Sequence, residues 1–231
     1  MSKAIDYARR YGLITSLGAF AIMALISVYG LMSIPADAII ARHWGLDGQP
    51  DGFSPRNHVL IGLPMLALIL SVIFAIIPVI DPRRKNIDQS RGLYLASCIG
   101  TLSVLVLAHG FVIWAAVTGG NLSFAIIGYA VAALLIVLGN FIAKSRSNWF
   151  LGVRTPWSLS SEHAWVAANR TAGWLMVLTG LAAAATIALL GEQKGVIVLI
   201  AGAVTSALAG VVVSFFAWRN DPDRHGAAGD M

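Results

Sequence analysis

The chain has 231 residues, of which 58% are hydrophobic and 12% are charged, and its mean hydropathy is +0.77. A soluble domain usually carries about a quarter charged residues, so this composition leaves too few charges for a water-facing surface and excludes a soluble protein. The net charge of +5 does not by itself indicate nucleic-acid binding, because membrane proteins gather basic residues in their cytoplasmic loops.

The first uncharged stretch, Tyr11–Ala36, exceeds the roughly 7–15 apolar residues of a signal peptide and favours a retained transmembrane helix. The later uncharged stretches are Val59–Ile80, Gly92–Ala143, Thr171–Gly191 and Gly195–Trp218. A spanning helix needs about 20 apolar residues, so the longest stretch holds two helices, separated by a turn at residues 118–121. The sequence predicts six transmembrane helices, at residues 12–34, 59–80, 93–117, 123–143, 172–190 and 196–217. Backbone groups in lipid must bond to one another, so the predicted fold is an all-α polytopic bundle.

Basic residues are distributed unequally between the two sets of loops. Thirteen of the 16 Lys and Arg residues fall at the chain ends and in the second and fourth loops. The first and fifth loops hold the remaining three, Arg42, Arg56 and Lys194. The positive-inside rule therefore predicts that both termini lie in the cytoplasm, and it explains the net charge without direct nucleic-acid binding.

The first loop, residues 37–57, is longer than a simple connection and is predicted to be external. Its Asp-Gly and Pro-Asp-Gly sequences are strong turn signals. Spaced acids weakly resemble a calcium loop, but the final glutamate is missing, and we predict no metal site. His43, next to Trp44, either contacts a ligand or anchors the loop at the membrane interface. The candidate residues of this loop are His43, Asp47, Pro50, Asp51 and Gly52.

A second polar segment, residues 148–173, follows the fourth span on the predicted cytoplasmic side. Thr155-Pro156 interrupts any helix, Ser158 or Ser160 is positioned to cap a new one, and Glu162 falls in its first turn. From Ser161 onward the pattern predicts a short amphipathic helix lying on the membrane before the fifth span, with Ala164, Trp165 and Ala168 on one face.

The charged residues of this segment have open alternatives. Arg154 and Arg170 either bind an anionic group, such as a lipid headgroup, a peptide terminus or a partner's acid, or they only orient the segment. Glu162 either favours the helix start or pairs with one of these arginines.

Two polar side chains lie inside the predicted spans. His109 is either functional or hydrogen-bonded to a neighbouring helix, and Asn140 is predicted to make an interhelical hydrogen bond. Gly202, Ser206 and Gly210 form a small-residue stripe suited to close packing within the chain. The sequence contains none of the common hydrolase, metalloprotease or nucleotide-binding motifs. We therefore expect no catalytic residue, no cofactor and no enzymatic activity.

The segment "NWFLGVRTPWSLSSEHAWVAANRTAG" resembles the signature of the SdpI-type immunity protein family. The first loop is similar to an N-terminal module of unassigned function that accompanies this family, through His43, Gly48, Pro50, Asp51 and Gly52. The positions that match the signature are Phe150, Gly152, Arg154, Thr155, Pro156, Trp157, Ser160, Glu162, Trp165, Asn169, Arg170 and Gly173.

The resemblance implies a six-helix protein of the bacterial inner membrane. It divides the chain into an N-terminal module, residues 1–92, with two spans and the external loop, and an SdpI-like module, residues 93–231, with four. It also implies immunity to a secreted membrane-active peptide toxin, and capture of a cytoplasmic winged-helix repressor. Val166-Ala167-Ala168 replaces more polar residues of relatives, which weakens the case for repressor capture.

Three functional hypotheses follow from these observations. The first is a non-enzymatic immunity or sensor protein that meets a peptide toxin at the bilayer. The second is a small transporter or channel for a peptide or an ion, which needs polar residues along a path across the membrane. The third is a membrane tether for a soluble partner. The sequence predicts contact with membrane lipids in all three cases and does not predict an oligomeric state.

Overall fold

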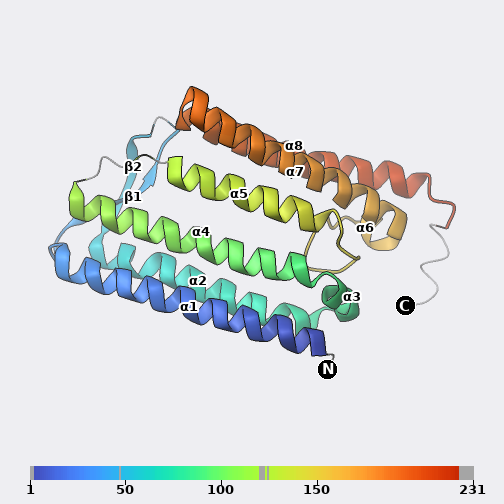
Figure 1. Cartoon of the computed structure of the whole chain (residues 1–231), viewed down its shortest axis with the longest axis horizontal. Coiled ribbons are helices and arrows are strands. Elements are labelled where there is room, and N and C mark those ends of the chain that lie inside the picture. Colours follow the sequence, from blue (N-terminus) through green and yellow to red (C-terminus); the bar gives the residue numbers. More distant parts are fainter. Residues whose placement is uncertain (1–2, 47, 120–122, 124, 224–231) are drawn as a thin grey trace.

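Six long helices form an elongated bundle in the computed structural model (Figure 1), which describes residues 3–46, 48–119, 123 and 125–223. They are α1 (Lys3–Ser33), α2 (Arg56–Ile80), α4 (Arg91–Thr118), α5 (Ala125–Ile142), α7 (Glu162–Leu190) and α8 (Glu192–Arg219). All six are long and apolar enough to cross a membrane. The predicted all-α, six-span membrane fold is therefore confirmed, and the protein is a multi-pass membrane protein.

The helix boundaries differ from the predicted spans mainly at polar ends. α1 begins at Lys3 rather than at residue 12, and α7 begins at Glu162 rather than at residue 172. Hydropathy locates the apolar part of a helix, but the backbone continues into water wherever its hydrogen bonds can continue. The predicted turn after Thr118 begins with Gly119, which ends α4 with a φ of +79°, and residues 120–122 lie outside the described part of the chain.

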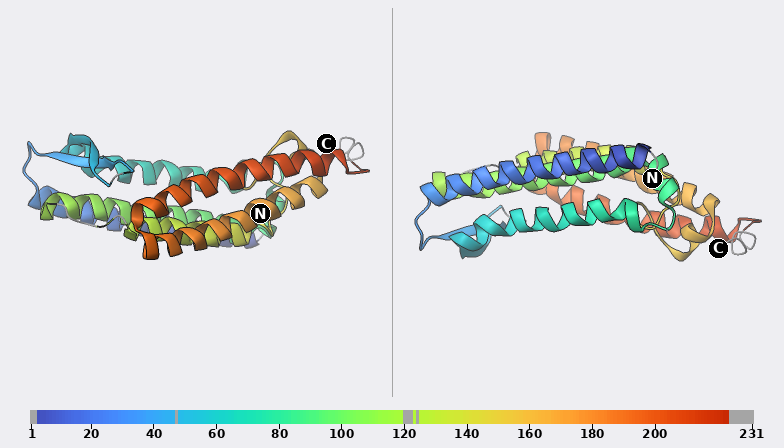
Figure 2. Two further views of the ribbon diagram at one scale, coloured as in Figure 1. Left: turned by 90° about the horizontal axis from the view of Figure 1, so that it is seen from above. Right: turned by 90° about the horizontal axis from the view of Figure 1, so that it is seen from below.

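The helices pack as two groups. α1 packs against α2 and α4, while α7 packs against α5 and α8. Two buried apolar clusters join the first group, and a smaller one joins the second. Figure 2 shows α1, α4, α5 and α7 in one layer, with α2 and α8 on the same side of it. The division at residue 92 remains a prediction based on sequence resemblance, whereas the packing associates α4 with α1 and α2.

Glycines allow the closest helix contacts in the second group. A Cβ atom added to Gly173 of α7 would lie 2.5 Å from the carbonyl oxygen of Gly139 in α5. On α8, Ser206 is buried, and Gly202 and Gly210 face Thr179 and Ala172 of α7. The small-residue stripe therefore serves packing within the chain, as predicted.

The first loop contains two strands that the sequence analysis did not predict. β1 (Ile39–Trp44) and β2 (Pro50–Pro55) form an irregular antiparallel hairpin, in which Ile39 pairs with Pro55 and His43 with Gly52. The turn signal at Gly48 was correct, because this glycine has a φ of +76° and its amide donates to the Gly45 carbonyl. The second signal, Pro50-Asp51-Gly52, was wrong, because these residues lie in β2. The strands are short, and neither IIARHW nor PDGFSP alternates clearly between apolar and polar residues. Asp47 lies outside the described residues.

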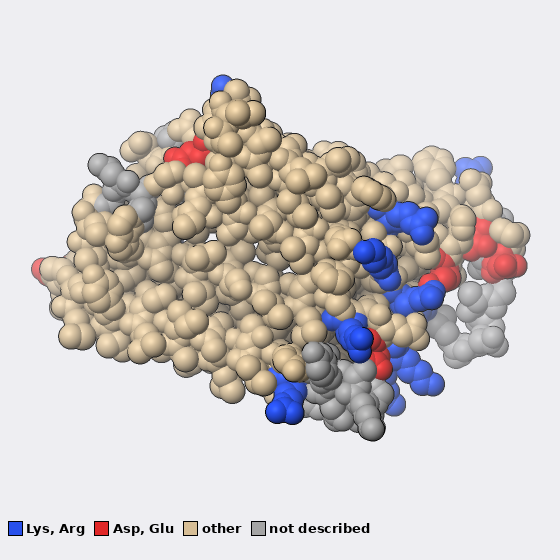
Figure 3. Space-filling model, viewed as in Figure 1, with Lys and Arg blue, Asp and Glu red and all other residues tan. Residues whose placement is uncertain are grey.

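We call the end of the bundle that carries this hairpin the hairpin end. The opposite end, which we call the basic end, carries two short helices, α3 (Arg84–Gln89) and α6 (Pro156–Ser160). α1 begins and α8 ends at the basic end (Figure 1). Figure 3 shows Lys and Arg gathered there, while the middle of the bundle presents almost no charge.

Candidate functional site

Residues 143–161, which we call the motif loop, connect α5 to α7 at the basic end and include α6. Thr155 caps α6. Its hydroxyl accepts a hydrogen bond from the Ser158 amide at 3.0 Å, and the Ser158 hydroxyl accepts one from the Thr155 amide at 2.9 Å. Pro156 occupies the first turn of α6, where its missing N–H is not needed. Ser161 then caps α7 through the Ala164 amide. The predicted caps, Ser158 and Ser160, were therefore wrong, although a helix start between the fourth and fifth spans was correctly predicted.

The short helix of this region lies earlier than predicted. α6 is the separate helix between spans four and five, whereas residues from Glu162 onward belong to one continuous α7. Ala164, Trp165 and Ala168 are completely buried. Their face does not lie on lipid, because the motif loop folds back over it, an arrangement that helical periodicity alone does not reveal.

Trp165, Asn169 and Gly152 hold the motif loop on α7. The Trp165 indole N–H donates to the Ser145 carbonyl at 2.9 Å, and the Asn169 Oδ1 accepts from the Val153 amide at 2.7 Å. Gly152 has a φ of +116°, and a Cβ atom there would lie 2.6 Å from Asn169 Oδ1 and 3.1 Å from the Trp165 ring. A glycine is therefore needed at this position for both conformation and space.

The first half of the motif loop is organised around Asn148, which is completely buried. Its Oδ1 accepts from the amides of Phe150 and Leu151, and its Nδ2 donates to the carbonyls of Arg146 and Leu151. Four hydrogen bonds from one side chain replace the regular backbone bonds that a loop lacks. The buried part of the motif thus has a structural role that the geometry fully explains.

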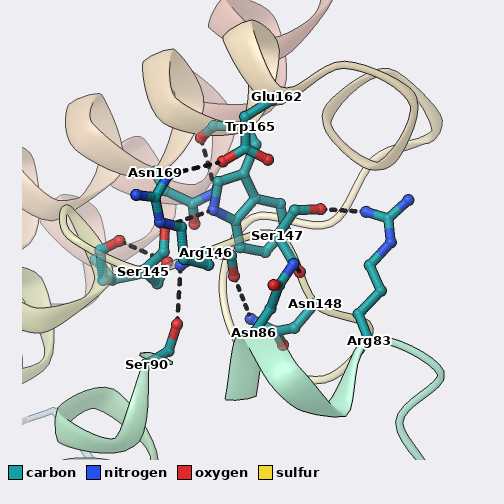
Figure 4. Close-up of polar contacts among 11 residues, drawn as sticks. Arg83, Asn86, Ser90, Ser145, Arg146, Ser147, Asn148, Glu162, Trp165 and Asn169 are labelled. Carbon is teal, nitrogen blue, oxygen red and sulfur yellow. Dashed lines mark hydrogen bonds and ion pairs between the residues drawn. The ribbon is translucent and has the colours of Figure 1, made fainter. Parts of the chain in front are cut away.

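Three residues in and around α3 hold the same loop from the other helix group (Figure 4). Arg83 donates to the Ser147 hydroxyl and, at 2.8 Å, to the Leu159 carbonyl. Asn86 donates to the Ser147 carbonyl, and the Ser90 hydroxyl accepts from the Arg146 amide. We call these contacts the basic-end clamp. Sequence reasoning missed the clamp, because its partners are about sixty residues apart.

Asp81 completes the clamp from a position that is 2% exposed. Its Oδ1 accepts from the Arg83 amide at 2.6 Å, and its Oδ2 accepts from the Trp149 amide at 3.0 Å. A buried carboxylate is stable only when such donors replace its water. One signal was available in the sequence: Asp81 is the first acid after a span and precedes a run of basic residues.

The remaining motif residues lie on the surface of the basic end. Arg154 is exposed and donates to the Trp149 carbonyl at 3.0 Å, and the Trp157 ring meets Phe215 of α8 edge to face at 5.1 Å. Arg83, Arg154 and Pro156 border a shallow pocket of about 440 Å³. Glu162 lies in the first turn of α7, as one of its two alternatives predicted, and its carboxylate lies 3.6 Å from Arg146 rather than beside Arg154 or Arg170.

The intramembrane polar residues have different surroundings. His109 is completely buried, and its Nε2 lies 2.9 Å from the Ser27 hydroxyl on α1. That hydroxyl also donates to the Leu60 carbonyl, so Nε2 must carry the proton that joins His109 to Ser27. Asn140 is exposed and accepts from Lys144 of the same segment at 2.9 Å, so its predicted interhelical bond was wrong.

A large groove lies at the hairpin end, between the helix groups. It has a volume of about 780 Å³, and its walls come from the hairpin and from α2, α4, α5 and α8. The apolar lining of the groove includes Phe111, Val131 and Leu199. Its polar rim is formed by Arg42, His43 and Asp51. His43 Nδ1 lies 2.5 Å from Asp51 Oδ1, which ties the two strands together.

Comparison with known proteins supports the resemblance of the motif loop to the SdpI family. Residues 144–216 match the model of the SdpI/YfhL protein family. The predicted SdpI resemblance is confirmed. Over 155 residues, which are 66% of this chain and 71% of the relative, the chain is 27% identical to the immunity protein SdpI of Bacillus subtilis (strain 168). No solved structure matches the chain significantly.

The SdpI-family match begins at Lys144, includes the motif loop and α7, and ends within α8. It therefore covers the residues that the motif loop buries against α7. The similarity supports an immunity-type membrane protein. Among the described residues, no three His, Cys, Asp or Glu side chains come together as they would around a metal ion.

Proposed function

We propose that this protein protects the bacterial inner membrane that it spans against a membrane-active peptide toxin. The observation that carries the proposal is the similarity to a protein named for immunity, which extends across 66% of the chain. The expected family and the six spans agree with that role. The proposal needs a surface at which the protein meets the peptide.

The basic end is assigned to the cytoplasm in this proposal. Most exposed bases of the described residues lie at this end: Arg84, Lys85, Arg91, Arg146 and Arg154 all belong to the second or fourth loop or its borders, whereas the hairpin end exposes Arg42 and Lys194. The membrane potential and the translocation machinery favour retention of such residues inside the cell. The hairpin end then faces the compartment from which a secreted peptide arrives.

The groove at the hairpin end is the proposed peptide site. A peptide that enters membranes exposes apolar side chains, and the groove presents an apolar interior to them. Its rim carries a histidine–aspartate pair and Arg42, which can bind the polar backbone or termini of a peptide. Binding there would hold the peptide at the membrane surface and keep it from inserting elsewhere.

Expression in a sensitive bacterium that lacks a relative tests this function. Wild-type protein should raise the minimum inhibitory concentration of at least one peptide in a panel of secreted membrane-active bacteriocins. Ala108→Trp, which places a large ring in the groove, should abolish the protection. Ala182→Trp, on the exposed face of α7, is the matched control and should keep it. Unchanged killing by every peptide, with wild-type protein present in the membrane, would contradict the proposal.

Capture of a cytoplasmic regulator is a second proposed role, favoured by the shallow pocket at Arg83 and Arg154. Arg154 is exposed on the rim of this pocket, where an arginine can pair with a carboxylate of a partner. A photo-crosslinker at Ser160, on that rim, should form a protein adduct in cells if a partner docks there. Adducts with lipid alone would exclude the role.

Transport is less well supported than immunity. Transport was predicted to need polar groups along a path across the membrane. His109, the main candidate, is instead completely buried, and its ring is hydrogen-bonded to Ser27. Ser71 and Ser206 likewise donate to carbonyls of their own helices. The donors of these three groups are bonded within the protein, so they are not free for a passing solute.

A further inference from the structure

A second groove runs along the bundle surface between α5 and α7 at the basic end. Its volume is about 490 Å³. The close approach of Gly139 and Gly173 forms its floor, and Ile136, Trp174 and Val177 add apolar walls. Trp174 is 63% exposed and faces outward, as tryptophans do near a membrane interface. The groove thus opens toward lipid over its length.

Two cations border this groove where it reaches the basic end: Lys144, from the start of the motif loop just after α5, and Arg170, from α7. Both are exposed. Lys144 uses one donor on Asn140, which leaves two N–H groups available. Among the described residues that line the groove there is no carboxylate, and Glu162, the acid in the first turn of α7, faces Arg146. The opening therefore presents uncompensated positive charge beside an apolar channel.

An adjoining groove provides space for a second hydrocarbon chain. It lies between α4 and α5, has a volume of about 580 Å³, and is lined almost entirely by apolar side chains. The two grooves share Val137 and Phe141 on α5. A molecule with one charged head and two apolar tails can therefore place one tail on each side of these residues.

We propose that Lys144 and Arg170 bind the phosphate of one anionic phospholipid, whose acyl chains occupy the two grooves beside α5. Arg170 supplies a planar fork for two phosphate oxygens and Lys144 a mobile point charge. An anionic phospholipid matches both the charge of the opening and the apolar channels behind it. This site lies at the opposite end from the proposed peptide groove, and its test is independent of immunity.

Native mass spectrometry of the purified protein measures the proposed site directly. The protein is mixed with equal amounts of phosphatidylglycerol and phosphatidylcholine that carry the same acyl chains. We expect wild-type protein to retain phosphatidylglycerol preferentially. The variant K144Q/R170Q should lose about twenty-fivefold in phosphatidylglycerol affinity, because each basic residue near an anionic headgroup contributes roughly fivefold. The control R84Q/K85Q removes the same charge from α3 at the same end and should retain the lipid.

A second variant separates a lipid from a free phosphate. V137W fills the shared part of the two grooves without changing charge, and it should weaken phosphatidylglycerol retention. Glycerol phosphate, offered alone, should not be retained by any form. Equal retention of phosphatidylglycerol by wild type and K144Q/R170Q would overturn the proposal. Retention of glycerol phosphate, or a normal affinity in V137W, would overturn the lipid as occupant.

Discussion

Gly152 shows how a single residue determines the conformation of the motif loop. Its φ of +116° lies in a region that side chains rarely adopt, and the Asn169 amide and the Trp165 ring occupy the space beside it. The strain of such a conformation costs a non-glycine residue about 1–3 kcal/mol. The loop can cover Trp165 because this position carries no Cβ atom.

We therefore predict that Gly152→Ala lowers the free energy of unfolding by about 1–3 kcal/mol or more. The thermal unfolding midpoint in detergent measures the effect. Gly18→Ala is the matched control, because no atom lies within 4 Å of its added methyl group, and alanine favours a helix. An equal decrease in both variants would show that Gly152 has no special role.

At the residue scale the sequence predicted the right positions but not their roles. Gly152, Trp165 and Asn169 all stood in the recognised motif, yet their contacts with one another depend on the path of the loop. The motif also contained residues of two kinds, buried ones that fix the loop and exposed ones, such as Arg154, Ser160 and Arg170. Residue type does not distinguish these kinds, because Ser158 is completely buried and Ser160 is exposed.

At the element scale, the basic-end clamp joins α3 to the motif loop and thus links the two helix groups. Arg83 donates to both Ser147 and Leu159, and Asp81 accepts from Trp149. These are charge-assisted hydrogen bonds to groups in a loop that has few regular backbone bonds. The clamp holds the loop in place over the buried face of α7.

Removal of the Arg83 charge should therefore loosen the motif loop without unfolding the bundle. We predict that Arg83→Gln speeds hydrogen exchange in residues 145–151 by about tenfold or more, since a hydrogen bond to a charged group contributes about 1.5–3 kcal/mol. Hydrogen–deuterium exchange with mass spectrometry follows this segment. Arg84→Gln, a neighbouring exposed arginine on α3, is expected to leave the exchange unchanged. Equally slow exchange in Arg83→Gln would contradict the clamp.

The spans themselves were predictable, whereas the elements between them were less so. Each span carries a long apolar run that hydropathy detects. α3, α6 and the hairpin are five or six residues per element, and short elements depend on tertiary contacts more than on propensity. The burial of Ile40 and the contact of Trp44 with Phe111 hold the hairpin in place. Neither of these contacts was evident from the local sequence.

At the scale of the whole molecule, the helix arrangement creates features that no single segment contains. The groove at the hairpin end draws its lining from four helices and the hairpin, so it requires the placement of α2 and α8 on one side of a layer. The sequence identified the polar rim through His43 and Asp51 and missed the apolar interior, because Phe111 and Leu199 look like ordinary span residues. Lys144 was counted only among the basic residues of the fourth loop, because the groove beside it exists only where α5 packs against α7.

Both proposed sites, for the peptide and for the regulator, depend on which end of the bundle lies outside the cell. The most direct test labels single cysteines in intact cells with a membrane-impermeant maleimide, in a Cys98→Ser background. Phe53→Cys marks the hairpin and Ser160→Cys marks the basic end; both positions are exposed. Our account predicts that position 53 is labelled in intact cells and that position 160 is labelled only after the cells are opened. Labelling of position 160, but not of position 53, in intact cells would contradict it.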